Sequence, residues 1–493
     1  MEYLICAGWL WDGVSPKPYE NHAVCVEEGR IKDMGPAGFL KEKYPDASVR
    51  EEQNWLILPG YVDAHDHGRG ISPFWFGAKD ESLEMWIPNL GRASAPVYEA
   101  ALYDGTMLAS SGVTTVVHCH NPFDMSRLEE ELLDTVRGYN DAGIRVVVCP
   151  PYTDQNSLIY SRRKEFEKAL PDRLQKEFGR MVCDTPLPLD DYFDLVENLK
   201  SRLSSRIKHH MADIQLHPVG GQWCSDRALL AMKEYACRQG MRVHMHLLET
   251  KYQMYYARDT WGKSMVAHLD EIGFLGPWLS CAHGVWLSDE DLERMARTGT
   301  IIVHNPSSNL RLRSGTMPLR KALDKNVVCA LGLDGCGYDD DQDYGRELRT
   351  ALYNNKQTGV DGAVTYEEVL RMALKGGQQV TGGKLSSGYL LPGGLADFVC
   401  LDYQKLTFPY ADPEVEILSM VVQKGNRDLV TAVYCGGHPI IGDREDAGKK
   451  IETSGRMLRN ALDNIRSRES RPVSKELLGA IHDYYEAWER RKE

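Results

Sequence analysis

The stretch Leu56-Ile57-Leu58-Pro59-Gly60-Tyr61-Val62-Asp63-Ala64-His65-Asp66-His67 runs from an apolar segment into a pair of histidines. Residues two apart on a β-strand point to the same side, so His65 and His67 can face one ligand. Alone, such a pair is weak evidence, because two histidines on a strand are often only hydrogen-bonded. Four further polar motifs close apolar, strand-like segments: His246-Leu247-Leu248-Glu249, Ala282-His283-Gly284, His304-Asn305-Pro306 and Gly332-Leu333-Asp334-Gly335. This series predicts one shared site built from the ends of several strands.

The middle of the chain predicts a parallel barrel. From residue 59 to about 388, short apolar segments alternate with helical patterns, which is typical of parallel βα units. The candidate strands are 56–62, 114–118, 145–149, 213–216, 242–246, 279–283, 300–304 and 328–333. Eight such units predict a closed (β/α)8 TIM barrel of the α/β class, whose chemistry gathers at the carboxyl ends of the strands.

The two terminal segments predict a second, smaller unit. Short strands are expected at 3–6, 23–27, 30–34 and 55–58, and strands return at 397–401, 418–423 and 429–434. We expect these strands to pair in one small β-sandwich that the barrel interrupts in sequence. The predicted division is therefore 1–58 and 389–450 for the two parts of the sandwich, 59–388 for the barrel and 451–493 for a helical extension.

Composition excludes several classes of partner. The 493 residues carry a net charge of −13, which argues against binding a nucleic-acid backbone. No segment approaches the roughly 20 apolar residues of a membrane span, and the N-terminus lacks the features of a signal peptide. The 12 cysteines are scattered without a CxxC motif, which predicts reduced thiols in a cytoplasmic protein. We expect a small-molecule substrate, no nucleic-acid or membrane partner, and a homodimer or higher homo-oligomer.

The ordered set of motifs resembles the amidohydrolase superfamily, within it the branch of deaminases and chlorohydrolases that includes guanine deaminase, adenosylhomocysteine deaminase and the triazine hydrolases. The resemblance implies that His65, His67, His246 and Asp334 bind a divalent metal, and it places His283 near that metal. His244 is an alternative ligand on the same strand, but the family spacing His-x-x-Glu favours His246 with Glu249. Imidazole and carboxylate ligands suit Zn²⁺ first, and Fe²⁺ or Mn²⁺ next.

One metal per chain is expected. The binuclear branch of the family uses a lysine at the end of strand 4, and residues 213–217 here contain none. Glu249 is implied as the group that takes a proton from the metal-activated water and passes it to the substrate. His283 and Asp334 are implied to orient that water.

Candidate substrate contacts come from four loops. His217 matches the position of a family histidine, although its loop departs from the family pattern. Gln222 and Trp223 could supply an amide and an aromatic face, Trp86 matches a family tryptophan over the pocket, and Trp75 could stack on a planar ligand. His304 begins a loop in which Arg311 matches a family position. Asp339 leads an acidic loop, 339–343, that favours an amino-rich ligand or is simply solvated.

These observations predict a metal-dependent aminohydrolase that deaminates a nitrogen-rich heterocycle or a guanidine-like molecule. A triazine-type chlorohydrolase or an N-alkylamine hydrolase is the alternative, because the same groups would serve another leaving group. A non-catalytic scaffold with this fold is a remote alternative, since scaffolds lose metal ligands and all the expected ones are present here.

Overall fold

The chain folds around a closed barrel of parallel strands. The structure, a computed structural model, describes residues 2–92, 95–155, 158–182, 187–335, 340–355, 359–360, 362–465 and 473–492. The barrel strands, in order around the ring, are β5 (Tyr61–Asp66), β6 (Val113–Cys119), β7 (Arg145–Cys149), β9 (Ala212–Ile214), β11 (Val243–Leu247), β12 (Leu279–His283), β13 (Ile301–His304) and β14 (Cys329–Leu331). Parallel bridges between Leu216 and Val243 and between Asp66 and Asp334 join the two halves. The predicted (β/α)8 barrel is thereby confirmed.

The first barrel strand begins later than predicted. Residues 56–58 belong to β4 (Ser48–Pro59) of the small sheet, and β5 starts only at Tyr61. Hydrogen bonding changes partner at this point: the Gly60 N–H donates to Asp397 O, and the Tyr61 N–H donates to Gly112 O, beside β6. Gly60 itself lies against Thr114, where a Cβ would come within 2.5 Å of the threonine side chain. The chain therefore passes from the small sheet to the barrel within one continuous apolar run, and the sequence pattern does not mark this change.

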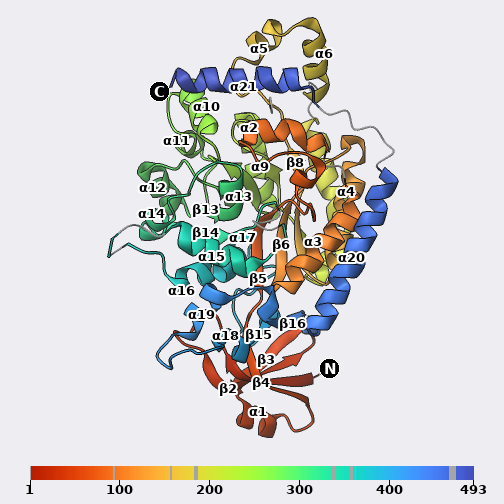
Figure 1. Cartoon of the computed structure of the whole chain (residues 1–493), viewed down its shortest axis with the longest axis vertical. Coiled ribbons are helices and arrows are strands. Elements are labelled where there is room, and N and C mark those ends of the chain that lie inside the picture. Colours follow the sequence, from red (N-terminus) through yellow and green to blue (C-terminus); the bar gives the residue numbers. More distant parts are fainter. Residues whose placement is uncertain are drawn as a thin grey trace.

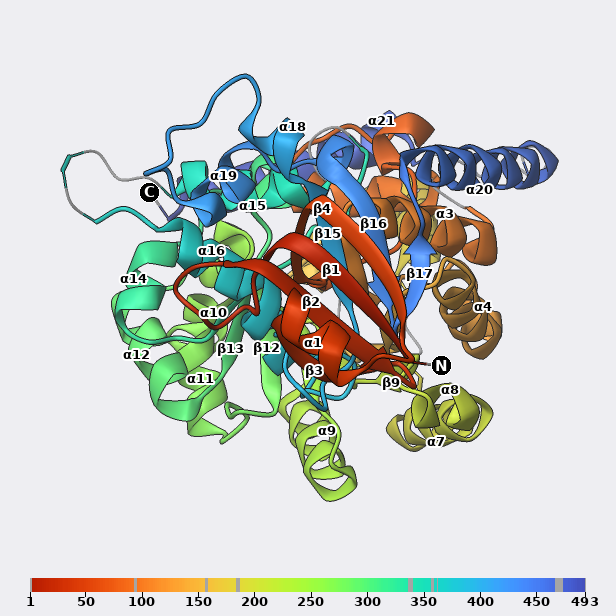
Figure 2. The ribbon, with the colours of Figure 1, turned by 90° about the horizontal axis from the view of Figure 1, so that it is seen from below.

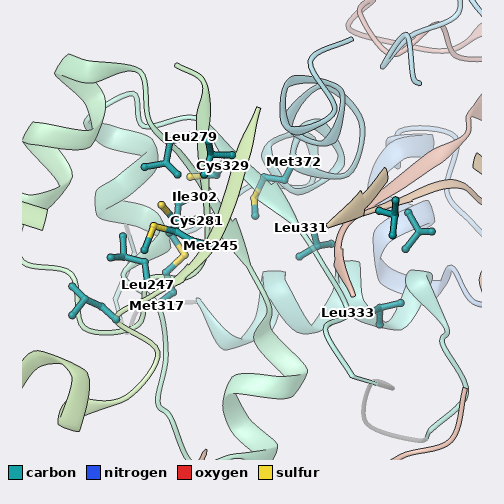
Figure 3. Close-up of a cluster of buried hydrophobic side chains, with 14 of the residues drawn as sticks. Met245, Leu247, Leu279, Cys281, Ile302, Met317, Cys329, Leu331, Leu333 and Met372 are labelled. Atoms are coloured by element: carbon teal, nitrogen blue, oxygen red, sulfur yellow. The ribbon is translucent and has the colours of Figure 1, made fainter. Parts of the chain in front are cut away.

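Helices cover the outside of the barrel (Figure 1). The helices that follow the barrel strands are α3 (Val97–Ser110), α4 (Leu128–Asp141), α7 (Leu189–Arg202), α9 (Asp226–Gln239), α10 (Lys251–Trp261), α11 (Met265–Glu271), α12 (Asp289–Thr298), α13 (Pro306–Arg311), α14 (Leu319–Asp324), α15 (Tyr344–Asn354) and α16 (Tyr366–Arg371). Side chains alternate along a strand. On β11, Met245 and Leu247 lie in the apolar layer with Cys281 and Ile302 (Figure 3). His244 and His246 accordingly face the other way, into the barrel.

The terminal segments form one seven-stranded sheet, as Figure 2 shows from below. Its order is β17 (His438–Ile441), β16 (Val430–Cys435), β15 (Phe398–Asp402), β4, β1 (Glu2–Leu10), β2 (Tyr19–Glu27) and β3 (Arg30–Pro36). The prediction that the two ends of the chain build one small β unit is confirmed. An apolar core that includes Ile5, Val24, Ile57 and Phe398 holds the two ends together.

The predicted strand at 418–423 is wrong, because this segment is the helix α19 (Ile417–Lys424). Leu418, Val421 and Val422 are its buried residues, and their spacing of three and four is that of one helix face. That face packs toward α15 and α16. A short apolar run fits either element in sequence, and here the neighbouring helices decide.

Two helices end the described chain. α20 (Arg444–Ile465) runs along α3, and α21 (Lys475–Arg490) crosses the end of the barrel that carries α10, opposite the small sheet (Figure 1). In the part of the chain that the structure describes, no helix has both the length and the apolar character needed to cross a membrane. The described cysteines carry free thiols, and all but Cys237 are buried. The domain boundaries at 58, 388 and 450 stay a prediction.

Candidate active site and metal centre

Five polar side chains converge at the carboxyl ends of the barrel strands. His65 lies on β5 with His67 directly after it, His246 lies on β11, His283 ends β12, and Asp334 follows β14. The Asp334 Oδ1 atom lies 3.2 Å from His67 Nε2 and 3.6 Å from His65 Nε2, and the Nε2 atoms of His67 and His246 are 3.4 Å apart. The structure thus brings together the four residues that the sequence nominated as ligands.

The separations of these atoms fit one metal ion. Bonds of about 2.0–2.1 Å at tetrahedral angles would place ligand atoms about 3.3 Å apart. The Nε2 atom of His65 is buried and has no hydrogen-bond partner among the described residues. Burial, together with neighbouring histidines, holds the pKa values of His65 and His246 well below their usual range. Neutral imidazoles with lone pairs directed at a common point are the donor set that zinc prefers.

Asp334 supplies the negative charge of this cluster. Burial alone would raise the pKa of its carboxyl group, but the hydrogen bond and charge of His67 hold that pKa below its usual range. The Ser308 hydroxyl donates a short hydrogen bond to Asp334 Oδ2. Asp334 has a φ of +66° and His283 a φ of +79°, a left-handed backbone that is strained for residues with a side chain. Strain of this kind is common at functional sites.

The second nitrogen of each histidine is held by a fixed partner. His65 Nδ1 lies 2.9 Å from His244 Nε2, and His244 Nδ1 lies 2.7 Å from Ser280 Oγ. The Nδ1 atoms of His67 and His246 lie 2.7 Å from the carbonyl oxygens of Cys119 and Val219. Such partners fix the tautomer and turn Nε2 toward the centre. His244 therefore orients His65, a candidate metal ligand, and does not take the place of His246 as a ligand. No sequence motif pointed to Ser280.

Glu249 and His283 form a pair of polar side chains beside the candidate metal ligands. Glu249 is buried, and its Oε2 atom lies 3.7 Å from His283 Nε2. Its Oε1 atom has no hydrogen-bond partner among the described residues. Burial raises the pKa of Glu249 to about 7. His283 Nδ1 is 2.9 Å from Asn309 Oδ1, which orients its ring. A carboxyl group poised near neutrality beside a candidate metal centre can accept a proton and return it.

A cavity of about 510 Å³ opens above these groups. His67, His246, Glu249, His283 and Asp334 line its floor. Much of the remaining wall is apolar or aromatic, and it includes Leu83, Trp86, Ile87, Leu90, Tyr152, Leu187, Val219, Trp223 and Leu312. This active-site cavity combines a polar floor with flat apolar walls, which suits a planar heterocycle.

Only some of the predicted substrate contacts line the active-site cavity. Trp86 and Trp223 line the active-site cavity. Trp75 does not reach it: this side chain is 68% exposed and donates a hydrogen bond of 2.8 Å to Asp340. Its stacking on a ligand therefore stays a prediction, without a place for Trp75 in the wall of this cavity. Asp339 lies outside the described residues.

Three other nominated side chains are buried beside the floor of the cavity. His304 lies 3.1 Å from the Asn355 amide nitrogen, and Gln222 is enclosed in the protein. His217 has its Nδ1 atom 2.7 Å from the His244 carbonyl oxygen, and its ring lies beside that of His246. None of the three is in the cavity wall, so direct substrate contact stays a prediction for each.

Sequence reasoning missed several wall residues. Asn121, Tyr152, Asp154 and Arg163 reach the cavity from the chain that follows β6 and β7. No motif marks these positions, because they lie singly along the connections after β6 and β7. Only the closed barrel brings them next to His67 and His246.

Comparison with known proteins finds a matching family and curated relatives. The model of the amidohydrolase family matches residues 56–440. The chain is 30% identical to a 5-methylthioadenosine/S-adenosylhomocysteine deaminase of Syntrophobacter fumaroxidans, over 86% of this chain and 89% of that protein. It is 28% identical to a 5′-deoxyadenosine deaminase of Methanosarcina mazei, over 84% of this chain and 86% of that protein.

A solved structure shares the fold. It is an adenosine deaminase from Xanthomonas campestris with bound zinc, with a TM-score of 0.75 and 24% identity. The similarity covers 94% of this chain and 98% of that one. Because the family model spans both the barrel strands and the five converging side chains, the chain belongs to the amidohydrolase family.

Proposed function

We propose that this protein is a metal-dependent aminohydrolase that deaminates an adenine nucleoside or a close analogue. Water would replace the exocyclic amino group of the ring, and ammonia would leave. The observation that carries the proposal is the meeting of His67, His246 and Asp334 with Glu249 on the floor of one apolar-walled cavity, with His65 buried against them. The names of the curated relatives, which are deaminases of adenine nucleosides, supply the substrate class.

We propose His65, His67, His246 and Asp334 as the ligands of one divalent ion per chain, with Zn²⁺ as the first expectation. When bound, such an ion supplies Lewis acidity that lowers the pKa of water to about 7. Three candidate clusters among the described residues, His65–His67–His246, His65–His283–Asp334 and His65–Cys119–His244, share His65, which supports a single ion at this site.

The protein's own groups would then move the protons. Glu249 Oε1, buried and unbonded within the described chain, is placed to take the proton of the attacking water. The same carboxyl group would deliver that proton to a ring nitrogen, which makes the ring carbon electrophilic. It would then pass the second proton of the water to the amino group, which leaves as ammonia. His283 Nε2, 3.7 Å from Glu249 Oε2, would hold the attacking oxygen by a hydrogen bond. Trp86 and Trp223 would bound the planar ring, and the apolar walls would exclude water.

The direct test is ammonia release. Zinc-loaded protein should release ammonia from adenosine, 5′-deoxyadenosine or methylthioadenosine, and should leave atrazine unchanged. Treatment with a chelator should abolish the release, and one equivalent of zinc should restore it. Failure to deaminate any adenine nucleoside would contradict the substrate class, and full activity of metal-free protein would contradict the mechanism.

The remaining expectations stay predictions of this proposal. They are a cytoplasmic location, a homodimer or higher homo-oligomer, and the absence of nucleic-acid and membrane partners. The net charge of −13 is the physical support for excluding nucleic acid.

A further inference from the structure

Glu84 is a buried carboxyl group just behind the wall of the active-site cavity. It lies on helix α2 (Leu83–Trp86), whose residues Leu83 and Trp86 line that cavity. The Glu84 side chain is not among the described residues that line it, and the residue is only 2% exposed. Its carboxyl group accepts a short hydrogen bond from the Thr250 hydroxyl at Oε1, and the Tyr160 hydroxyl is a second partner. Glu84 therefore joins three segments that are far apart in the sequence.

The bond to Thr250 ties α2 to the residue that follows Glu249. Thr250 occupies the N-cap position of α10, where a threonine hydroxyl usually accepts a hydrogen bond from a backbone N–H of the first helical turn. Here the hydroxyl makes no such bond and donates to Glu84 instead. The start of α10 is thus fixed to α2 by a side chain that would otherwise cap its own helix.

The turn that carries Glu249 needs restraints of this kind. Leu248 has a φ of +48°, in the left-handed region, and such a backbone persists only where the surroundings hold it. The Leu248 carbonyl accepts from the Trp286 N–H at 3.1 Å, and the Glu249 N–H donates to Gln253 Oε1 at 2.9 Å. The bond from Thr250 to α2 is a further restraint on the same strained turn.

The bond to Tyr160 ties α2 to the aromatic wall of the cavity. The Tyr160 ring makes an edge contact with Trp223, at 6.0 Å between centroids, and Trp223 lines the active-site cavity. A second edge contact, at 5.7 Å, joins Tyr160 to Tyr485 of α21. The Tyr160 hydroxyl, placed by these rings, reaches Glu84. Glu84 thereby links the wall residue Trp223 to the helix that carries the wall residue Trp86.

We propose that Glu84 is a positioning residue that fixes both the proton carrier and the aromatic walls of the active site. Through Thr250 it holds the turn of Glu249, and through Tyr160 it holds the walls. The inference rests on the proposed function, because that function assigns the proton transfer to Glu249. The two bonds have separable consequences: misplacement of the proton carrier lowers kcat, whereas loosened walls weaken binding of the substrate ring and raise KM.

Single hydroxyl deletions test the two bonds on the zinc-loaded protein. Thr250→Val keeps the shape of the side chain and should lower kcat about tenfold, with KM within about twofold of the wild type. Thr250→Ser retains the hydroxyl and should recover most of the wild-type kcat. Tyr160→Phe should raise KM about fivefold and leave kcat within about twofold. Thr298→Val is the matched control, because that hydroxyl bonds within its own outer helix, α12, and its loss should change neither constant. Metal content should be the same in every variant.

A double variant tests whether Thr250 acts through Glu84. Glu84→Ala should show both changes, and adding Thr250→Val to it should lower kcat no further, because the shared bond is already lost. A further loss of about tenfold would overturn the proposal, since Thr250 would then act without Glu84. If Glu84→Ala does not fold, the single variants decide. Equal kcat in Thr250→Val and Thr250→Ser, or an unchanged KM in Tyr160→Phe, overturns the corresponding half of the proposal.

Crystal structures of the wild type, Thr250→Val and Thr250→Ser separate this inference from the proposed function. In Thr250→Val, Glu249 Oε2 should move by about 1 Å or more from its place 3.7 Å from His283 Nε2, and in Thr250→Ser it should stay there. A wild-type protein that deaminates no adenine nucleoside contradicts the proposed function, and the displacement of Glu249 still tests Glu84. An unmoved Glu249 in Thr250→Val overturns the inference, whichever substrates the protein turns over.

Discussion

Glu249 shows how one side chain acquires a chemical role from its surroundings. The carboxyl group is buried among apolar walls, and burial is the main cause that raises its pKa to about 7. His283 opposes this effect, while Asp334 adds to it. A group whose two protonation states are nearly equal in free energy can both accept and donate a proton within one turnover. This is the property that deamination requires, because the two protons of the water must be moved, one to a ring nitrogen and one to the leaving amino group.

We predict that Glu249→Gln lowers kcat by about 10²–10⁴-fold, the usual contribution of a general acid–base, while the bound metal is retained. The amide keeps the shape of the side chain but cannot accept the proton. Turnover and metal content should be measured on the same preparation, with the exposed Glu234→Gln on α9 as the control. A turnover near the wild-type rate would rule out Glu249 as the proton carrier.

At single residues, sequence reasoning worked where the chemistry imposes a spacing. His65 and His67 are two apart because they share one side of a strand end, and Glu249 follows His246 by three residues. Trp75 shows where this reasoning ends: nothing in the sequence shows that the side chain turns outward to Asp340. The hydrogen bond between His244 and Ser280 could not be predicted either, because it joins two strands through side chains that carry no motif.

Among the elements, three loops over the site are tied by one cation. Arg311, at the end of α13, donates to Asp80 Oδ2 at 3.0 Å, Ser72 Oγ at 3.0 Å and Asp340 Oδ1 at 2.6 Å. Asp340 in turn accepts from Trp75. Arg311 thereby links the loop after β5 and the loop after β14 to α13, above the strand ends that carry His67 and Asp334. The acidic loop, expected either to favour an amino-rich ligand or to be solvated, uses Asp340 to bind Arg311 and Trp75 of the protein itself.

We predict that Arg311→Gln lowers kcat/KM by about tenfold with unchanged metal content, because two carboxylates lose their charge-assisted donor. Limited proteolysis near residues 72–80 should become faster at the same time. Arg297→Gln is a suitable control, since that arginine pairs with Asp270 on the outside of the barrel and is 62% exposed. Unchanged proteolysis and kcat/KM would mean that the loops hold their positions without Arg311.

Strand or helix could be predicted from sequence for segments that lie wholly in one sheet. It could not be predicted for a run that two sheets share, or for a short apolar run that fits either element. The barrel strands at 145–149 and 279–283 are found as predicted. The run 56–62 failed because it passes from the small sheet to the barrel at Gly60, and the change rests on contacts with Asp397 and Gly112. The prediction for segment 418–423 was wrong because a short apolar run fits a strand or a helix face equally well.

At the scale of the whole molecule, a buried ion pair joins the barrel to the small sheet. Arg145 on β7 donates from Nε and Nη2 to the two oxygens of Asp397, which precedes β15, at 2.9 Å each. Both side chains are almost fully buried, with exposures of 2% and 7%. The Gly436 N–H also donates to Asp397 Oδ1, and the Asp397 carbonyl accepts from Gly60, where the chain enters the barrel. One aspartate therefore connects both halves of the small sheet to the barrel.

We predict that Asp397→Asn lowers the free energy of unfolding by about 3–5 kcal/mol, because it leaves the Arg145 guanidinium buried without its counter-charge. Chemical denaturation of the metal-free protein measures this loss without a contribution from bound metal. Glu445→Gln, which breaks an exposed pair with Lys449, is the control and should change stability by less than about 1 kcal/mol.

The double variant Arg145→Met, Asp397→Leu separates two explanations of that loss. If the cost comes from an uncompensated buried charge, removing both charges should recover much of the stability, as apolar replacements of buried ion pairs often do. If the cost comes instead from the lost contacts of Asp397 with Gly436 and Arg145, the double variant should be at least as unstable as Asp397→Asn. A small effect of Asp397→Asn itself would mean that the apolar contacts around Phe398 and Ile57, and not this pair, join the sheet to the barrel.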